Sequence, residues 1–312
     1  MGSWTKARVE ILKLKEYCFT NLKDKELWPS YYERRYLEFL NFLDLFPDRK
    51  IEHVLELGCG VGYYSAFLAK IADHVTATDL ESIDPVTHSP GLQITRDILK
   101  SLDVNNVTVM NASAESLPFP DNSFDMVFSS HVLEHVPDVN KAVSEINRVL
   151  RPGGINICIV PTTTDRIYAL AYFYMYLLKR TVIKLFNLVF PAPKSVAMQG
   201  HASAEKSIAA AANAYLKYFP FPEPHGVLQS YTQELKHWTL SNWRRIITGS
   251  GRIKLVSQRG LQLNPVLPLS GVFFPIAGVK IYRLTRRVEN KLSGLPVFKQ
   301  LGLSTMVITE KQ

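Results

Sequence analysis

The chain has 312 residues, which suits one full domain with large additions or two domains, and its hydrophobic content of 46% is ample for a core. Its three cysteines form neither a disulfide framework nor a metal-ligand spacing, so we expect a reducing, cytoplasmic compartment and no metal site. The net charge of +8 predicts an anionic partner, either nucleic acid or a membrane surface.

The first 50 residues are predicted to form an N-terminal helical segment. Apolar residues recur at helical spacing from Val9 to Tyr17, and a second apolar segment covers residues 31–46. This segment is expected either to lie across the substrate side of the following domain or simply to pack against it.

A glycine-rich turn follows the apolar strand predicted at residues 54–57. Glycine stands at every second position of the turn, Gly58, Gly60 and Gly62, and a helix then begins. An α/β sheet binds nucleotide-like ligands at such a turn, because glycine lets the backbone approach the ligand closely. The spacing differs from the Gly-x-Gly-x-x-Gly of dinucleotide sites, and Glu56 would repel a phosphate. A ligand with an ammonium and a sulfonium charge is therefore expected.

A second short strand is predicted at residues 74–79 and ends in Asp79, 17 residues after Gly62. A carboxylate at this place in an α/β nucleotide site accepts hydrogen bonds from ribose hydroxyls.

A buried strand predicted at residues 123–130 carries Ser130 and His131 to the same edge of the sheet. A helix follows, and the Pro-Gly-Gly at residues 152–154 is expected to break it before the next apolar strand at 155–160.

Five motifs in a fixed order resemble class I S-adenosylmethionine (SAM)-dependent methyltransferases, in the branch that contains quinone and sterol methyltransferases. They are Leu-Glu-Leu-Gly-Cys-Gly at 55–60, Leu-Pro-Phe at 117–119, Ser-Phe-Asp at 123–125, Leu-Glu-His-Val at 133–136 and Arg-Pro-Gly-Gly at 151–154. The resemblance covers about a third of the chain. It implies an α/β fold with a doubly wound, seven-stranded Rossmann-like sheet, SAM as the cofactor and S-adenosylhomocysteine as its product.

The resemblance also assigns cofactor-binding roles. The glycines would pass beneath the methionine part of SAM, Glu56 would hold its amino group and Asp79 its ribose. Ser113 stands where this branch often has Asp, which weakens the transfer of the adenine role. The predicted cofactor-binding residues are Glu56, Gly58, Gly60, Gly62, Asp79, Ser113, Ala114, Glu115, Ser130 and His131. Each has a structural alternative, such as turn geometry for the glycines or a helix N-terminal charge for Glu56.

An oxygen or carbon acceptor must lose a proton, so a general base is expected. His131 follows the strand edge directly, and His225 lies in the rigid Pro-Glu-Pro-His-Gly loop at 222–226, which could also be an ordinary surface loop. His131 and His225 are the predicted catalytic residues.

Two insertions extend the domain predicted at residues 51–161. Residues 162–235 contain a twelve-residue apolar run followed by Lys179, Arg180 and Lys184, which is typical either of a membrane-interface helix or of a cap over the acceptor. The C-terminal part, 236–312, is expected to close the sheet with an antiparallel pair.

The second insertion, 259–302, separates these closing strands. It pairs an apolar stretch containing Phe273 and Phe274 with the basic cluster from Lys280 to Lys291. Base-stacking proteins interleave aromatic and basic residues, and here the two are segregated, so an anionic membrane surface is favoured over nucleic acid.

Three functions fit the sequence. The first is O-methylation of an amphiphilic or lipid-like acceptor by a peripheral protein at the inner face of a membrane. The second is a soluble methyltransferase for a small hydrophobic acceptor, and the third is a SAM-binding scaffold without catalysis. The oligomeric state is left open.

Overall fold

The computed structural model describes residues 3–21, 36, 38–44, 49–82, 91–189, 219–249, 252–261 and 302–312. Its sheet has seven strands in the order β3-β2-β1-β4-β5-β7-β6. In chain order they are β1 (Ile51–Leu57), β2 (Ala72–Asp79), β3 (Val107–Asn111), β4 (Phe124–Ser130), β5 (Leu150–Pro161), β6 (Ile253–Leu261) and β7 (Ser304–Lys311). Strands β1 to β5 pair in parallel, whereas β7 is antiparallel to both β5 and β6. The predicted fold class and the closing antiparallel pair are confirmed.

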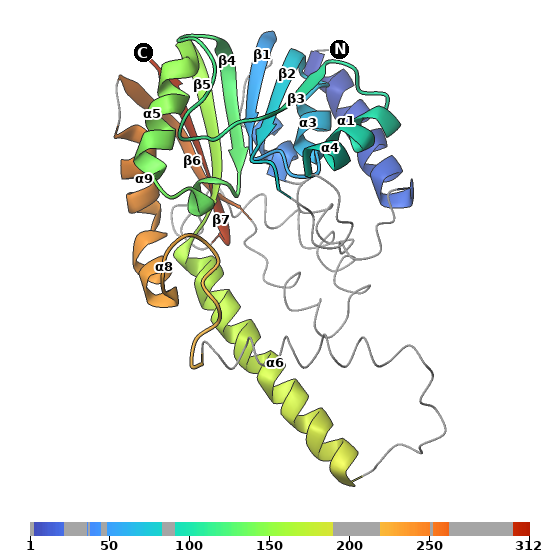
Figure 1. Ribbon diagram of the computed structural model, residues 1–312, viewed down its shortest axis with the longest axis vertical. Coiled ribbons are helices and arrows are strands. Elements are labelled where there is room, and N and C mark those ends of the chain that lie inside the picture. Colours follow the sequence, from blue (N-terminus) through green and yellow to red (C-terminus); the bar gives the residue numbers. More distant parts are fainter. Residues whose placement is uncertain are drawn as a thin grey trace.

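Helices cover both faces of the sheet (Figure 1). One face carries α1 (Ser3–Asn21), α3 (Tyr63–Leu68) and α4 (Gly91–Ser101). The other face carries α5 (Val139–Val149) and α9 (Leu240–Thr248). The remaining helices are the short 3-10 helix η1 (Leu133–His135), α6 (Thr163–Val189) and α8 (Tyr231–His237). Residues 38–44 are helical as well, and the domain boundary at residue 50 stays a prediction.

Two apolar layers form the core. On the first face, Phe39 and Phe42 from the N-terminal segment pack with Phe67 and Phe128. On the second face, α5 buries apolar residues at helical spacing, among them Val143 and Ile146, against β4 and β5. Burial of both faces explains why consecutive residues of β4, Met126, Val127 and Phe128, are all apolar.

The register brings the carboxyl ends of the central strands together. Leu57 of β1 lies opposite Thr78 of β2 and opposite Ser129 of β4. Asp79 and Ser130, each one residue further on, therefore reach the same edge of the sheet, next to the turn that begins at Gly58.

Two boundaries differ from the prediction. Strand β5 begins at Leu150 and includes the Pro-Gly-Gly, because Leu150 already pairs with Phe124 and the extra residues bulge out before Ile155 pairs with Met126. Strand β6 continues to Leu261, which pairs with Ser304, so the connection to β7 begins later than residue 259.

Helix α6 projects from the sheet and extends away from it (Figure 1). Its 27 residues give it a length of about 40 Å. Leu178, Val182 and Leu185, four and three residues apart on one helix face, are all more than half exposed. Within the described part of the chain, no helix combines the length and apolarity needed to cross a bilayer.

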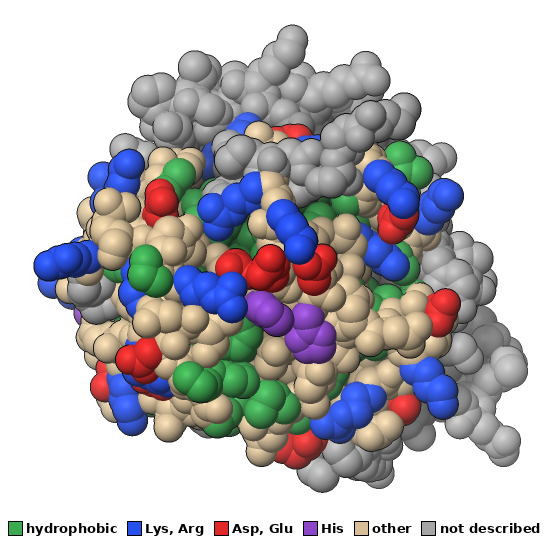
Figure 2. All heavy atoms as spheres, turned by 90° about the horizontal axis from the view of Figure 1, so that it is seen from above, with side chains coloured by type: hydrophobic (Ala, Val, Ile, Leu, Met, Phe, Trp, Pro, Cys, Tyr) green, Lys and Arg blue, Asp and Glu red, His purple; other side chains and the backbone are tan. Residues whose placement is uncertain are grey.

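The opposite end of the sheet, where the parallel strands begin, carries mixed charges. Figure 2 shows basic, acidic and histidine side chains interspersed on this face. Ion pairs join Lys50 to Asp73 at 3.0 Å and Arg151 to Asp125 at 2.8 Å. Basic and acidic side chains are therefore mixed at this end.

Candidate functional site

The glycine turn between β1 and α3 has a backbone that other residues adopt with difficulty. Gly58 and Gly62 have φ angles of 67° and 84°. A Cβ atom at Gly58 would lie 2.3 Å from Cγ2 of Val132, so this glycine also permits a close approach of two segments. A Cβ atom at Gly60 would meet no described atom within 4 Å. The turn is thus closely packed at Gly58 and open at Gly60, where a ligand fits.

Asp79 is fixed against this turn. Its Oδ2 accepts a hydrogen bond from the Gly60 N–H at 2.8 Å, and its Oδ1 accepts one from the Leu80 N–H at 2.8 Å. The structure therefore brings Asp79 and the glycines together, as the sequence predicted. The remaining lone pairs of this carboxylate are suited to ribose hydroxyls.

Glu56 is buried beneath the turn, with 1% of its surface exposed. Burial, with a smaller contribution from the charge of Asp79, raises its pKa to about 8, although a hydrogen bond from the Ser65 hydroxyl opposes the shift. In the described part of the chain, no lysine or arginine pairs with Glu56. A buried carboxyl group without a cation fits an incoming ammonium group, so the residues present suit the methionine end of SAM.

The three residues predicted to border adenine lie directly after β3. The N–H of Ala112 donates to the carbonyl of Asp79 at 3.1 Å, and the N–H of Glu115 donates to the Ser113 hydroxyl at 3.2 Å. The carboxylate of Glu115 accepts from the N–H of Asp138 at 2.8 Å. This carboxylate therefore ties the segment to the start of α5, and the adenine role of Ser113, Ala114 and Glu115 stays a prediction.

His131 lies between two buried carboxylates. Its Nδ1 is 3.3 Å from Oε1 of Glu134, and its Nε2 is 3.7 Å from Oε1 of Glu38 and 3.3 Å from the Ser304 hydroxyl. The backbone of His131 has a φ of 56°, an unusual left-handed conformation for a residue other than glycine. Such strained positions occur at functional sites, and here the imidazole lies between both carboxylates.

Glu38 links His131 to the cofactor side. The Tyr64 hydroxyl donates a hydrogen bond to Oε2 of Glu38, and the Ser130 hydroxyl lies 3.4 Å from the Tyr64 oxygen. Sequence reasoning missed Glu38 and Tyr64, because Glu38 is 93 positions from His131 and stands in an ordinary helical pattern. The Leu-Glu-His motif did contain the signal for Glu134.

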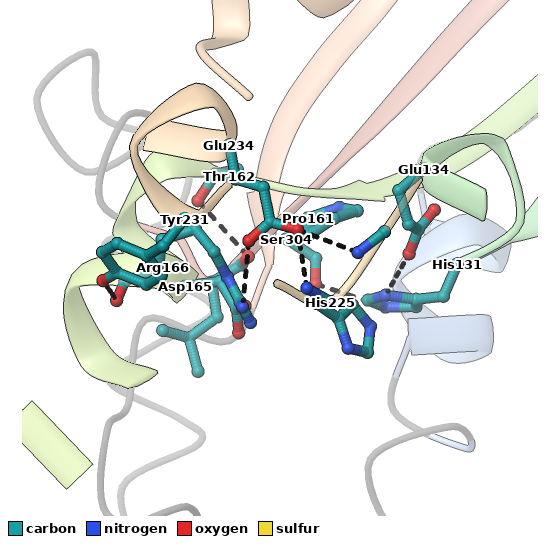
Figure 3. A network of polar contacts seen from close by, with 12 residues as sticks. His131, Glu134, Pro161, Thr162, Asp165, Arg166, His225, Tyr231, Glu234 and Ser304 are labelled. Carbon is teal, nitrogen blue, oxygen red and sulfur yellow. Dashed lines mark hydrogen bonds and ion pairs between the residues drawn. The ribbon is translucent and has the colours of Figure 1, made fainter. Parts of the chain in front are cut away.

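His225 reaches the same region from the insertion (Figure 3). The buried carboxylate of Glu234 accepts from the N–H groups of His225 and Gly226, at 2.6 and 2.8 Å. Arg166 lies 3.3 Å from the other oxygen of Glu234. The His225 ring packs edge-on against Trp238 and lies 5.0 Å from the ring of His135, centroid to centroid. The predicted rigid loop thus aims His225 at the η1 turn.

The strand order, the glycine turn and the acidic residue that ends β2 define the fold of class I SAM-dependent methyltransferases. Residues 55–158 match the family described as a methyltransferase domain. The central part of the chain is therefore a methyltransferase domain, and its cofactor is SAM.

Curated relatives agree with this assignment. The chain is 40% identical over 113 residues to the ubiquinone/menaquinone biosynthesis C-methyltransferase UbiE of Haemophilus ducreyi, covering 36% of this chain and 42% of that protein. It is 36% identical over 124 residues to a demethylmenaquinone methyltransferase of Listeria welshimeri, covering 38% and 48%. The chain thus spans about half the length of the curated relatives it matches.

Among solved structures, the PH0226 protein of Pyrococcus horikoshii aligns over 95% of this chain and 96% of its own, with 16% identity and a TM-score of 0.49. The fold assignment rests on the strand order of the sheet itself.

Proposed function

We propose that this protein is a SAM-dependent methyltransferase that methylates a hydroxyl group of an amphiphilic, lipid-like acceptor at the inner face of a membrane. The observation that carries the proposal is the position of His131, between Glu38 and Glu134 and beside the glycine turn at residues 58–62. A histidine poised between two carboxylates is suited to removing the proton that an oxygen or carbon acceptor must lose.

Bound SAM supplies a methyl group activated by its sulfonium charge. Burial alone would raise the pKa of Glu134, but the neighbouring His131 and His135 lower it below its usual value, so this carboxyl group is ionised. An ionised Glu134 favours the tautomer of His131 with the proton on Nδ1. Nε2 is then the nitrogen that accepts a proton, and the resulting imidazolium is stabilised by both carboxylates.

The test of the base replaces His131 with Ala in the full chain. Turnover should fall about 10²–10⁴-fold, the usual contribution of a general base, while affinity for S-adenosylhomocysteine stays nearly unchanged. His74→Ala, which removes a histidine at the other end of the sheet, is the matched control. If neither His131→Ala nor His225→Ala loses more than about tenfold in turnover, catalysis rests on positioning alone.

His225 is the second candidate for the base. It lies near Glu134, and its pKa is lowered by burial and by the positive charges of Arg166 and His135, so its imidazole is neutral and can accept a proton. The same assay on His225→Ala separates the two candidates, because the true base shows the larger loss of turnover.

The names of the curated relatives refer to quinone precursors and to C-methylation. Lipophilic quinone-type phenols are therefore the first acceptors to test, and NMR of the product distinguishes a methoxy group from a C-methyl group. A chain that binds SAM but methylates no acceptor would favour the non-catalytic scaffold.

The membrane part of the proposal is supported by α6 and by the charge of +8. Leu178, Val182 and Leu185 present an exposed apolar face on a helix that stands away from the sheet (Figure 1). The side chains of Lys179, Arg180 and Lys184 lie outside the described residues, as do Phe273, Phe274 and the cluster from Lys280 to Lys291.

Vesicle flotation tests this part. Binding should require anionic lipid, weaken in high salt and fall when Leu178 and Leu185 are both changed to Ser. Val256→Ser, which alters an exposed apolar residue on β6, should bind like the wild type. A protein that ignores anionic vesicles at low salt, while it still methylates a dissolved hydrophobic acceptor, is the soluble enzyme.

A further inference from the structure

The tertiary structure brings together three metal-ligating side chains that the sequence does not group. Glu134 and His135 are neighbours in η1, whereas His225 comes from the loop before α8. One donor atom from each of the three lies within 4.8 Å of the others. Two imidazoles and one carboxylate are a frequent ligand set for zinc and related ions, with further positions left for water or substrate.

The carboxylate of Glu134 is the observation that points to a bound cation. Glu134 is 2% exposed; among the described residues its Oε2 has no hydrogen-bond partner, whereas its Oε1 lies 3.3 Å from Nδ1 of His131. Leaving an oxygen of a buried carboxylate without a partner is costly unless a cation compensates it.

Hydrogen bonds and close packing hold the backbone around the three residues in place. The N–H of Val227 donates to the carbonyl of Glu134 at 3.0 Å. A Cβ atom at Gly226 would lie only 2.3 Å from that carbonyl oxygen, so the close contact requires glycine. Glu234 fixes the same loop from its other side. The loop therefore presents His225 to η1 at a defined distance.

We propose that Glu134, His135 and His225 bind a divalent first-row transition-metal ion, with zinc as the preferred ion. A tetrahedral zinc ion holds its donor atoms roughly 3.4 Å apart, so the two imidazoles need only side-chain rotation to close the remaining gap. Both histidines are exposed, whereas Glu134 is buried.

An ion at this site would lie beside His131 on the acceptor side of the cofactor turn. If the proposed function holds, its open positions would bind the acceptor hydroxyl and lower the pKa of that group, which favours transfer of the proton to His131. Metal binding itself needs neither SAM nor the acceptor, so it is measured separately from methyl transfer.

The experiment uses the tag-free 312-residue chain after treatment with a chelator. Binding of Co²⁺ is followed by visible absorption, and binding of Zn²⁺ is measured by calorimetry. The wild type should bind one ion per chain. The variants Glu134→Gln, His135→Ala and His225→Ala should each lose more than the roughly 10–100-fold in affinity that is typical of a lost outer-shell partner. His74→Ala is the control, since it removes one member of a histidine pair, His53 and His74, whose ring centroids are 6.5 Å apart at the other end of the sheet.

Binding of S-adenosylhomocysteine and the thermal unfolding midpoint show whether each variant is folded. If Glu134→Gln destabilises the protein, the two histidine variants test the metal site, because both imidazoles are exposed. A wild type that binds no ion overturns the proposal. So does a wild-type affinity that survives in both His135→Ala and His225→Ala, since the ion would then lie elsewhere.

Discussion

Replacing Glu56 with Gln tests the account of the cofactor turn most directly. The side chains have nearly the same shape, and a Gln oxygen can still accept the hydrogen bond that the Ser65 hydroxyl donates to Glu56 at 2.5 Å. The substitution therefore removes the ionisable group and leaves the packing beneath the glycine turn in place.

The magnitude follows from the pKa of Glu56, which burial and Asp79 raise from 4.5 to about 8 in the folded protein. Between these two pH values the folded protein keeps a proton that the unfolded chain has released. The free energy of unfolding therefore falls as the pH rises through this window, and the loss is complete above the folded-state pKa. The difference in pKa corresponds to at most about 5 kcal/mol. Glu56→Gln escapes this loss and should be the more stable protein at alkaline pH.

The assay is urea unfolding at pH 5 and pH 9. The variant and the wild type should have similar stability at pH 5, and the variant should be more stable by about 2–5 kcal/mol at pH 9. Glu52→Gln, at an exposed position of the same strand, is the control and should show no such gap. Parallel loss of stability in Glu56→Gln and the wild type between the two pH values would refute the reasoning.

The same carboxyl group makes cofactor binding depend on pH. An ammonium group beside Glu56 stabilises the carboxylate, so binding of S-adenosylhomocysteine should release a proton from the wild type. Its affinity should rise between pH 6 and pH 8, by up to about tenfold per pH unit, and Glu56→Gln should show no such rise. Calorimetry in two buffers with different ionisation enthalpies measures the proton release, and a value of zero in the wild type would contradict the assignment of Glu56.

Three further predictions concern single residues. Asp79→Ala should weaken binding of S-adenosylhomocysteine by about 1.5–3 kcal/mol, the value of a hydrogen bond to a charged group. Equal affinities of the variant and the wild type in calorimetry would refute the assignment of Asp79 to the ribose. Gly58→Ala should lower the free energy of unfolding by more than the roughly 1–2 kcal/mol that a left-handed backbone costs, because its Cβ would also collide with Val132. Denaturant unfolding measures this loss, and a smaller loss would mean that the turn can shift. Glu234→Ala should lower the free energy of unfolding by about 3–5 kcal/mol, since it leaves the buried Arg166 with one partner fewer and two N–H groups of the His225 loop without an acceptor. A loss below about 1 kcal/mol would show that the contacts of Glu234 are dispensable.

The cofactor half of the site was predictable from the sequence because its residues act close to where they stand in the chain. The glycines of the turn follow β1 directly, and Asp79 ends the next strand, which pairs in parallel with β1. Once both segments are recognised as strands of a parallel sheet, geometry alone brings their carboxyl ends together. Hydrophobic pattern and turn residues therefore indicated the strands, the glycine turn and the position of Asp79, and the family resemblance implied the seven-stranded fold.

Local pattern was less reliable at element boundaries. The Pro-Gly-Gly at residues 152–154 signals a break, and α5 does end at Val149. Strand β5 nevertheless begins at Leu150, because pairing with Phe124 on the neighbouring strand outweighs the local preference. A cross-strand partner of this kind is set by the packed sheet and leaves no mark in the segment itself.

Only the tertiary structure decided the acceptor half of the site. Glu38, His131 and Ser304 come from the N-terminal segment, the end of β4 and the start of β7, and His225 approaches Glu134 from an insertion 91 positions away. Sequence spacing identified His131 and His225 as separate candidates and predicted no metal site, because no window of the chain contains both η1 and the loop before α8. Long-range packing joined them, through the contact of Gly226 and Val227 with the carbonyl of Glu134 and the clamp by Glu234. The sequence thus determined that the glycine turn and Asp79 lie at one edge of the sheet, whereas the folded chain decided which groups surround the buried carboxylate of Glu134.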